Sequence, residues 1–205
     1  MIGLAGAHRV GKTSLARAFA EKHGLEFVET SASAIFSEMR LDPAATYDFS
    51  TRLTVQEEIL KRFDALYASH IGTDLAITDR TPLDMLAYTM AEAIGDTVMA
   101  EDQKRFKRYA QACFDVTNKR FGVLLVVQPG IEIVPAKGKA AANAAYIEHL
   151  SSLILGLSVD ERVKAAHFYI PRYMVDMDER IGALEFAVGR ARKRAQIERE
   201  DLPLH

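Results

Sequence analysis

The stretch GAHRVGKTS, residues 6–14, follows the short apolar run MIGLA and precedes a segment with a helical pattern. It has the spacing Gly-x-x-x-x-Gly-Lys-Ser/Thr, with Gly6, Gly11, Lys12 and Thr13 at the fixed positions. Glycines at this spacing let the backbone curl so that successive N–H groups face one anion, and the dipole of the following helix points at the same anion. The stretch therefore predicts a strand, a phosphate-binding loop and a helix. A tight glycine turn without a ligand is the alternative.

The loop predicts ATP and Mg²⁺ as cofactors. Lys12 would bridge the β- and γ-phosphates, and the Thr13 hydroxyl would hold Mg²⁺. His8 and Arg9 can either contact phosphate or face solvent, so we expect from them only backbone donation. The predicted ATP-binding residues are Gly6, Ala7, His8, Arg9, Val10, Gly11, Lys12, Thr13 and Ser14.

Composition is that of a cytoplasmic globular protein. The 205 residues suffice for one domain with a full core, and 49% hydrophobic with 26% charged residues fit a globular protein. A net charge of −2 gives no bulk attraction to nucleic acid or to a membrane. The single cysteine, Cys113, cannot form an internal disulfide and is expected to be a buried apolar side chain. We find no signal-peptide pattern and no run long enough to cross a bilayer, so a cytoplasmic location without a membrane partner is expected. The oligomeric state stays open.

Short apolar runs alternate with longer helical patterns along the chain. Continuous apolar strands separated by helices predict a parallel sheet that is covered on both faces. The expected strands are MIGLAG, LEFVE, DLAITD, FGVLLVVQ and AHFYI. The expected helices cover about 12–23, 31–40, 50–70, 82–94, 98–119, 140–157 and 176–199.

Two segments have the spacing of a helix-capping box. In TPLD, Thr81 would be the N-cap, Pro82 the first helical residue and Asp84 the reciprocal partner. The segment SVDE, which begins at Ser158, has a similar spacing and would begin another helix.

Polar residues follow the predicted strands at the edge where ligands of open α/β sheets bind. Asp79 and Arg80 end one strand: Asp79 could orient Mg²⁺ through water or accept a proton from an attacking hydroxyl, and Arg80 could grip a phosphate. A turn cap and a structural salt bridge are the alternatives for these two residues, whereas for Asp84 the capping box is favoured. Glu29 ends another strand and could contact the acceptor or act as its base, unless it is only an exposed carboxylate.

A predicted helix carries Arg52 and Gln56 one turn apart on the same side. Together they could hold an acceptor phosphate or the edge of a base. A solvated helix face explains them equally well. The basic runs KRFKR (104–108) and RARKRAQIER (190–199) are favoured as solvated faces, although a kinase acting on DNA would place positive charge beside its cleft.

The motifs GAHRVGKTSLARAFA, FVETSAS and ITDRTPLDMLAY together resemble the thymidylate-kinase-like group of P-loop kinases. The resemblance is closest to the phage branch that includes 5-hydroxymethyluracil DNA kinases, some of which are labelled only as ATPases. It covers nearly the whole chain and implies one domain, residues 1–205, with a five-stranded parallel sheet in the order 2-3-1-4-5 and helices on both faces. By the same resemblance, Asp79 and Arg80 place the acceptor and the metal, and Glu29 matches a catalytic acid whose usual Glu-Pro is Glu-Thr here.

The resemblance also implies a lid or acceptor segment at about 129–157. Nucleoside monophosphate kinases carry an arginine-rich lid there, whereas this chain has Lys137 and Lys139 in a segment rich in alanine and glycine. These lysines could close over a phosphate or lie against a nucleic-acid backbone.

Three functions follow. The leading hypothesis, which rests on the resemblance, is an ATP-dependent kinase acting on 5-hydroxymethyluracil in phage DNA, in the host cytoplasm, for which the base must leave the duplex. The first alternative is a kinase of free deoxynucleosides or nucleoside monophosphates, and the second is an ATPase switch without an acceptor. A GTPase is disfavoured because TNKR, residues 117–120, lacks the aspartate of a guanine-binding motif.

Overall fold

The computed structural model describes residues 1–42, 45–70, 76–93, 98–133 and 143–200. Within them, five parallel strands form one sheet in the order β2-β3-β1-β4-β5, so the predicted α/β fold and strand order are confirmed. The strands are β1 (Ile2–Ala5), β2 (Glu26–Val28), β3 (Ala76–Thr78), β4 (Val123–Val127) and β5 (Ala166–Ile170). The helices are α1 (Lys12–His23), α2 (Ala32–Glu38), α3 (Phe49–Ser69), α4 (Pro82–Glu92), α5 (Ala100–Arg120), α6 (Ala144–Ser158) and α7 (Met177–Glu200).

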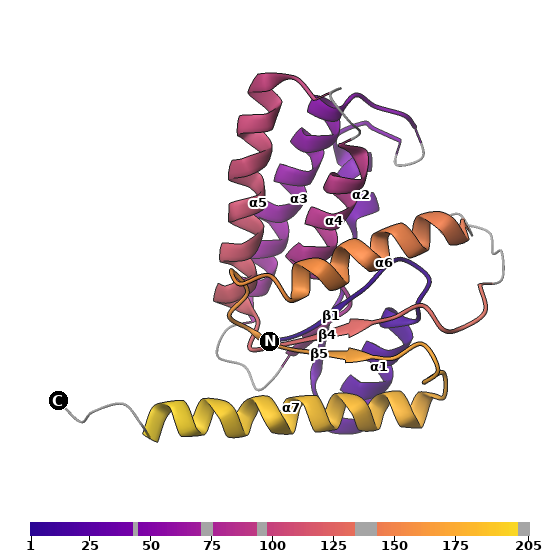
Figure 1. The fold of residues 1–205 in the computed structure, drawn as a ribbon, viewed down its shortest axis with the longest axis vertical. Coiled ribbons are helices and arrows are strands. Elements are labelled where there is room, and N and C mark those ends of the chain that lie inside the picture. Colours follow the sequence, from indigo (N-terminus) through magenta and orange to yellow (C-terminus); the bar gives the residue numbers. More distant parts are fainter. Residues whose placement is uncertain (43–44, 71–75, 94–97, 134–142, 201–205) are drawn as a thin grey trace.

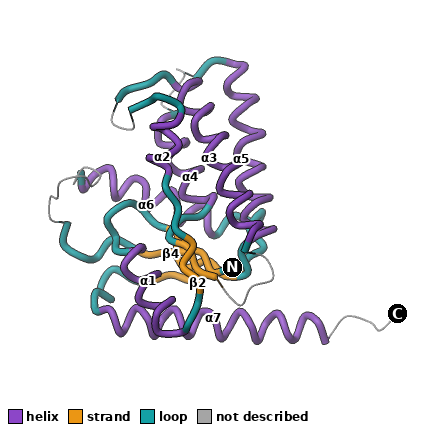
Figure 2. The backbone as a smooth tube through the Cα atoms, turned by 180° about the vertical axis from the view of Figure 1, so that it is seen from behind, coloured by secondary structure: helices purple, strands orange, loops and turns teal. Residues whose placement is uncertain are grey.

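Helices cover the sheet on both faces, and the three central strands, β1, β3 and β4, are buried along their whole length. Figure 1 shows α1 and α7 below the sheet, and α6 with the group of α2 to α5 above it; the same layers are seen from behind in Figure 2. In β4, Leu124 and Val126 face the core that α3, α4 and α5 close, whereas Leu125 and Val127 face the core shared with α1 and α7. This alternation within an uninterrupted apolar strand is what a doubly covered parallel sheet requires.

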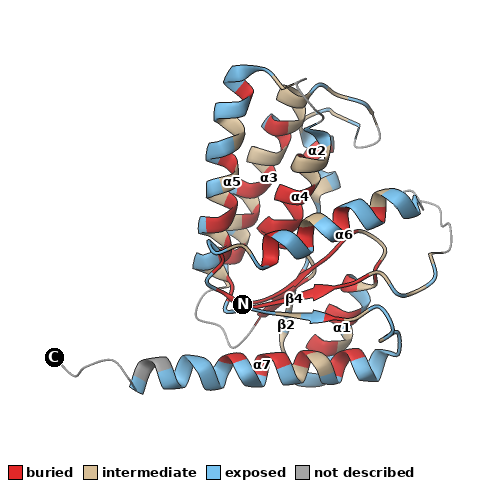
Figure 3. Cartoon of the chain, in the orientation of Figure 1, coloured by how far each residue is buried: buried red, intermediate tan, exposed pale blue. Residues whose placement is uncertain are grey.

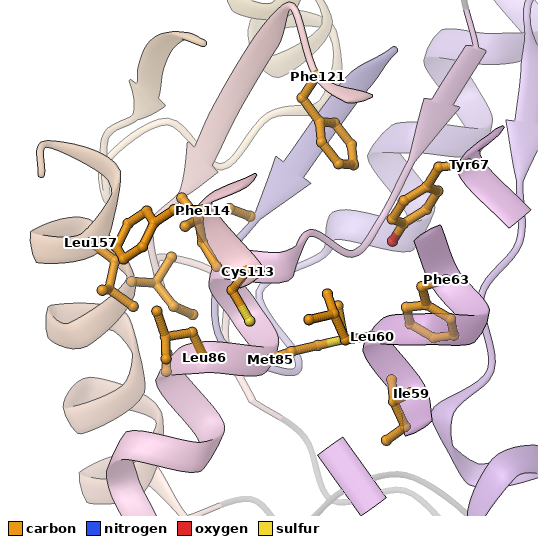
Figure 4. Close-up of a cluster of buried hydrophobic side chains, with 14 of the residues drawn as sticks. Ile59, Leu60, Phe63, Tyr67, Met85, Leu86, Cys113, Phe114, Phe121 and Leu157 are labelled. Atoms are coloured by element: carbon orange, nitrogen blue, oxygen red, sulfur yellow. The ribbon is translucent and has the colours of Figure 1, made fainter. Parts of the chain in front are cut away.

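The core next to the α3–α4–α5 group contains Cys113. Figure 4 shows its sulfur among buried apolar side chains of these helices. Burial raises the pKa of the Cys113 thiol to about 12, so the side chain is an inert apolar group at neutral pH, as expected.

One of the two predicted capping boxes forms. The Thr81 hydroxyl accepts from the Asp84 amide, and the Asp84 carboxylate accepts from the Thr81 amide at 2.7 Å, so α4 begins as predicted. The second prediction is wrong: Ser158 is the last residue of α6, and its hydroxyl donates to the Leu155 carbonyl. Ser158 lies inside the last turn of an apolar helix, where a hydroxyl commonly bonds back to the preceding turn.

Candidate active site

The phosphate-binding motif lies between β1 and α1, at the carboxyl edge of the sheet. Gly6 has φ +152° and Gly11 has φ +89°, and Arg9 adopts a left-handed conformation with φ +64°. A Cβ on Gly6 would come within 2.6 Å of the Val127 carbonyl oxygen, so only glycine fits there. The backbone therefore has the curled shape that lets successive amides face one anion.

The side chain of Lys12 is folded back over this loop. It is buried, and its Nζ donates to the carbonyl oxygens of Gly6 at 2.5 Å and Ala7 at 2.7 Å. Burial lowers the pKa of Lys12 to about 8, although the nearby Asp84 carboxylate raises it. The ammonium group thus lies within the loop at the place where a bound polyphosphate would replace carbonyl oxygens as its partner.

Asp84 supports the loop as well as capping α4. Its Oδ1 accepts from the Gly6 amide at 2.7 Å, while Oδ2 accepts from the amide and the hydroxyl of Thr81. Burial raises the pKa of this carboxyl, and the donors from Gly6 and Thr81 together with the charge on Lys12 oppose that shift. The sequence predicted the cap but gave no sign of the bond to Gly6, which is 78 residues away in the chain.

Asp79 lies just beyond β3, beside the first turn of α1. Its carboxylate accepts hydrogen bonds from the hydroxyls of Thr13 and, at 3.3 Å, Thr30. The structure thus brings together the two residues that the sequence assigned to Mg²⁺, Thr13 and Asp79. Glu29 is at the same edge, but its exposed carboxylate pairs with Arg17 at 3.0 Å.

These groups fit a magnesium nucleotide. Mg²⁺ prefers one or two carboxylate or hydroxyl ligands and takes its remaining ligands from phosphate and water. Thr13 and Asp79 offer such groups next to the loop, and the described residues contain no cluster of three or more His, Cys, Asp or Glu side chains that would hold a metal by itself.

A cavity of about 440 Å³ opens beside the loop. Its walls come from α2, α3, α4 and the first turn of α6, and two of its lining residues, His8 and Arg80, belong to the phosphate edge itself. Much of the wall is apolar or aromatic, from Phe36, Ile59, Phe63 and Met85 among others, and Figure 4 shows three of these within the core. The volume and the mixed lining are typical of a site for one small organic molecule.

Arg52 and Gln56 both line this cavity, since they are one turn apart on α3. Arg52 donates to the Ala45 carbonyl at 2.7 Å, and its guanidinium lies 5.2 Å from the ring centre of Tyr47. Arg80 lines the cavity too and forms no ion pair with any described residue. Besides these two arginines and Gln56, the polar lining includes a second amide, Asn143, and one carboxylate, Glu92.

Two tyrosines that the sequence analysis missed join the loop to the cavity. Tyr88 Oη lies 2.8 Å from Nδ1 of His8 and accepts from the His8 amide at 3.2 Å. Burial raises the pKa of Tyr88, so the phenol keeps the proton that it can donate to Nδ1. Tyr146, on α6, packs against the rings of both residues. The signal was the spacing of Asp84 and Tyr88, because residues four apart share one helix face.

Other predicted residues lie away from this site. Lys137 and Lys139 fall outside the described residues, as does most of the connection before α6. Of the basic runs, Lys104 and Arg108 are exposed on α5, and residues 192–197 of α7 are exposed (Figure 3). Within the described ranges, no helix is long and apolar enough to cross a bilayer.

Several solved structures share this fold. Deoxyadenosine kinase from M. mycoides, solved with dCMP and dCDP, superposes with a TM-score of 0.64 at 15% identity over 92% of this chain and 98% of that one. NadR protein in complex with NR gives a TM-score of 0.67 at 12% identity over 92% and 50% of the two chains. Thymidylate kinase from Candida albicans gives 0.59 at 12% identity over 93% and 91%. At these identities the likeness establishes a shared fold.

Sequence comparison identifies the family. None of the curated proteins compared with the sequence matches it. A sequence profile described as an AAA domain matches residues 1–121, which include the phosphate loop, Asp79 and Asp84. Because this match covers more than half of the 205 residues, the chain belongs to the AAA domain family of P-loop proteins.

Proposed function

We propose that the protein is an ATP-dependent kinase that transfers the γ-phosphate to a free nucleoside or nucleotide. The observation that carries this proposal is the adjacency of two sites: His8 and Arg80 are part of the phosphate edge and also line the 440 Å³ cavity. A switch that only hydrolyses ATP has no need of a cavity for a second molecule. Neighbours in the fold, such as deoxyadenosine kinase and thymidylate kinase, support the same function.

The acceptor would lie in the cavity with its base between apolar and aromatic side chains. Gln56 offers both a donor and an acceptor to the edge of a base, and Arg52 and Arg80 offer positive charge to an acceptor phosphate. The cavity lies beyond the ends of the strands, so the reacting oxygen would point back toward the loop. Transfer from one oxygen to another is then a matter of positioning and of neutralising charge.

On the donor side, the curled amides from Gly6 to Ser14 and the ammonium of Lys12 would hold the phosphates. Thr13 and Asp79 would hold Mg²⁺, which supplies charge neutralisation when it is bound. Arg80 would contact the transferred phosphoryl group. We assign the metal side to Asp79, whereas Glu29 can act as a base only after leaving Arg17, with which it now pairs.

This proposal departs from the leading hypothesis of the sequence analysis, a base within phage DNA. The cavity has the size of one nucleoside, so a DNA substrate would have to place an extruded base in it. Lys137 and Lys139, which would distinguish a phosphate lid from a nucleic-acid contact, lie outside the described residues. We therefore keep residues 129–157 as a proposed lid or acceptor segment and the DNA base as an outcome of the test.

The test is a transfer assay with γ-labelled ATP and Mg²⁺. Free deoxynucleosides, nucleoside monophosphates, ordinary DNA and DNA containing 5-hydroxymethyluracil are offered separately, and Lys12→Ala is the inactive control. We expect label on a free nucleoside or nucleotide. Label confined to the modified DNA would refute the small acceptor and restore the other hypothesis, and release of inorganic phosphate alone under all four conditions would refute a kinase.

A further inference from the structure

Arg180, in the first turn of α7, is a buried cation behind the phosphate loop. Only 2% of the residue is exposed, and no described carboxylate forms an ion pair with it. Its Nε donates to the Met174 carbonyl oxygen at 2.7 Å, and its Nη1 donates to the Val10 carbonyl oxygen at 3.1 Å. The remaining Nη2 is buried and has no hydrogen-bond partner in the described part of the chain. Burying such a charge is costly, so its retention calls for an explanation.

The bond to Val10 fixes the orientation of one peptide group in the loop. In a trans peptide, the carbonyl of one residue and the N–H of the next point in opposite directions. Because the Val10 carbonyl points to Arg180, the Gly11 N–H points away from Arg180, as it must if it is to donate to a phosphate bound on the other side of the loop. Turning this peptide over would place a carbonyl oxygen where a phosphate oxygen should bind.

The guanidinium also lies close to Gly11. A Cβ built on Gly11 would stand 3.0 Å from Nη1 of Arg180 and 3.2 Å from Cδ1 of Ile131. Arg9, one residue before this peptide, has φ +64°, a conformation that is costly for a residue other than glycine and that persists where the surroundings hold it. Arg180 is placed to supply such a restraint.

The rigid attachment of Arg180 supports this role. Asp176 precedes α7, and its carboxylate accepts from the amides of Asp178, at 2.9 Å, and of Glu179, at 3.1 Å. The Arg180 amide in turn donates to the Asp176 carbonyl. The first turn of α7 is therefore fixed at its start, and the side chain of Arg180 reaches the loop from a rigid base.

We propose that Arg180 is a positioning residue for the polyphosphate of the donor nucleotide. It holds the Val10–Gly11 peptide with its N–H toward the phosphates, and its unneutralised charge favours a polyanion on the far side of the loop. This inference rests on the proposed function, since it concerns the ATP site, but it concerns donor binding and not the acceptor. The effect should extend to any ligand that fills the loop with phosphates.

The test compares Arg180→Met with Arg120→Met. Arg120 is a matched control because its side chain is also nearly buried, at 7% exposure, and pairs with Asp64 at 2.5 Å on α3, away from the loop. The dissociation constants of ATP and of inorganic tripolyphosphate are measured by calorimetry, with the melting temperature as a check of folding. We expect Arg180→Met to weaken both ligands roughly 10- to 100-fold, as for the loss of one hydrogen bond from a charged group, while Arg120→Met leaves both unchanged.

Two further variants separate positioning from a general structural role. Arg180→Lys keeps the charge and should recover part of the affinity, and it carries the test if Arg180→Met does not fold. Arg180→Ala should regain affinity for tripolyphosphate when about 10 mM guanidinium chloride is added, but not with the same concentration of sodium chloride. Wild-type affinity in folded Arg180→Met, or equal losses in Arg120→Met, would overturn the proposal.

The outcomes are distinct from those of the transfer assay. If wild-type protein binds ATP, Arg180→Met weakens that binding, and no acceptor receives phosphate, the kinase is refuted and this inference stands. A wild-type protein that binds neither ATP nor tripolyphosphate would refute both.

Discussion

Replacing Asp84 by asparagine should destabilise the fold, whereas the same change at Asp79 should not. Both oxygens of the Asp84 carboxylate accept backbone amides, from Gly6 through Oδ1 and from Thr81 through Oδ2, each at 2.7 Å. An asparagine keeps one acceptor oxygen and turns its NH₂ toward the other amide, which leaves a buried donor facing a donor. At Asp79, both partners are threonine hydroxyls, which can rotate to accept from an amide NH₂.

The expected magnitudes follow from these contacts. A buried donor left without an acceptor costs about 1–3 kcal/mol, so Asp84→Asn should lower the free energy of unfolding by about that amount. For a chain of 205 residues, this corresponds to a fall in melting temperature of about 2–12 °C. Asp79 is partly exposed, and replacing it by asparagine keeps both hydrogen-bond partners. This substitution should change the free energy of unfolding by no more than about 0.5 kcal/mol.

The assay is thermal and urea unfolding of the two variants, followed by circular dichroism in the absence of nucleotide. Urea midpoints at an unchanged slope report the stability difference, and a changed slope would show that the unfolding is no longer comparable. Equal melting temperatures for the two variants, or a greater loss in Asp79→Asn, would refute the role of Asp84 in joining the loop to α4.

The remaining predictions concern catalysis and binding. Asp79→Asn should lower kcat about 100-fold and by more than Asp84→Asn does, as measured by steady-state phosphotransfer; equal losses would contradict the assignment of Asp79 to the metal side. Burial lowers the pKa of Lys12 to about 8, and phosphates bind its ammonium form. Above pH 8, ATP binding should therefore take up one proton, and its affinity should weaken about tenfold per pH unit. Calorimetry in two buffers of different ionisation enthalpy measures both, and a constant affinity from pH 7 to pH 10 would contradict the prediction. Gln56→Leu should raise the KM of the acceptor at least about 10-fold without changing the KM of ATP. Glu57 is the next residue on the same helix and pairs with Arg105, so Glu57→Gln serves as a control and should change neither KM.

The sequence predicted the order of elements well because each is decided locally. The apolar runs of the strands, the Pro82 start of α4 and the glycine spacing of the loop depend on neighbours within a few residues. Arg52 and Gln56 could be placed on one side of α3 for the same reason, and both line the cavity. The wrong helix start at Ser158 came from a short polar pattern that also occurs where a helix ends.

The contacts that shape the candidate site could not be predicted, because they join residues far apart in the chain. Gly6 and Asp84 are 78 residues apart, and Val10 and Arg180 are 170 apart. Apolar periodicity marks Phe36 and Phe63 as inward-facing, but it does not tell a core position from a cavity wall. Arginine on a helix is also usually solvated, so nothing in the local pattern distinguishes Arg180 from the exposed Arg190 and Arg192 further along α7.

The central claim is that one ligand can fill the phosphate loop and the neighbouring cavity together. It is tested most directly by calorimetry with a compound in which adenosine and a deoxynucleoside are joined through a chain of four or five phosphates. We predict that this compound binds at least about 100-fold more tightly than ATP, excludes both ATP and the free nucleoside, and loses affinity in Gln56→Leu. An affinity equal to that of ATP, with the free nucleoside still able to bind alongside it, would contradict the account.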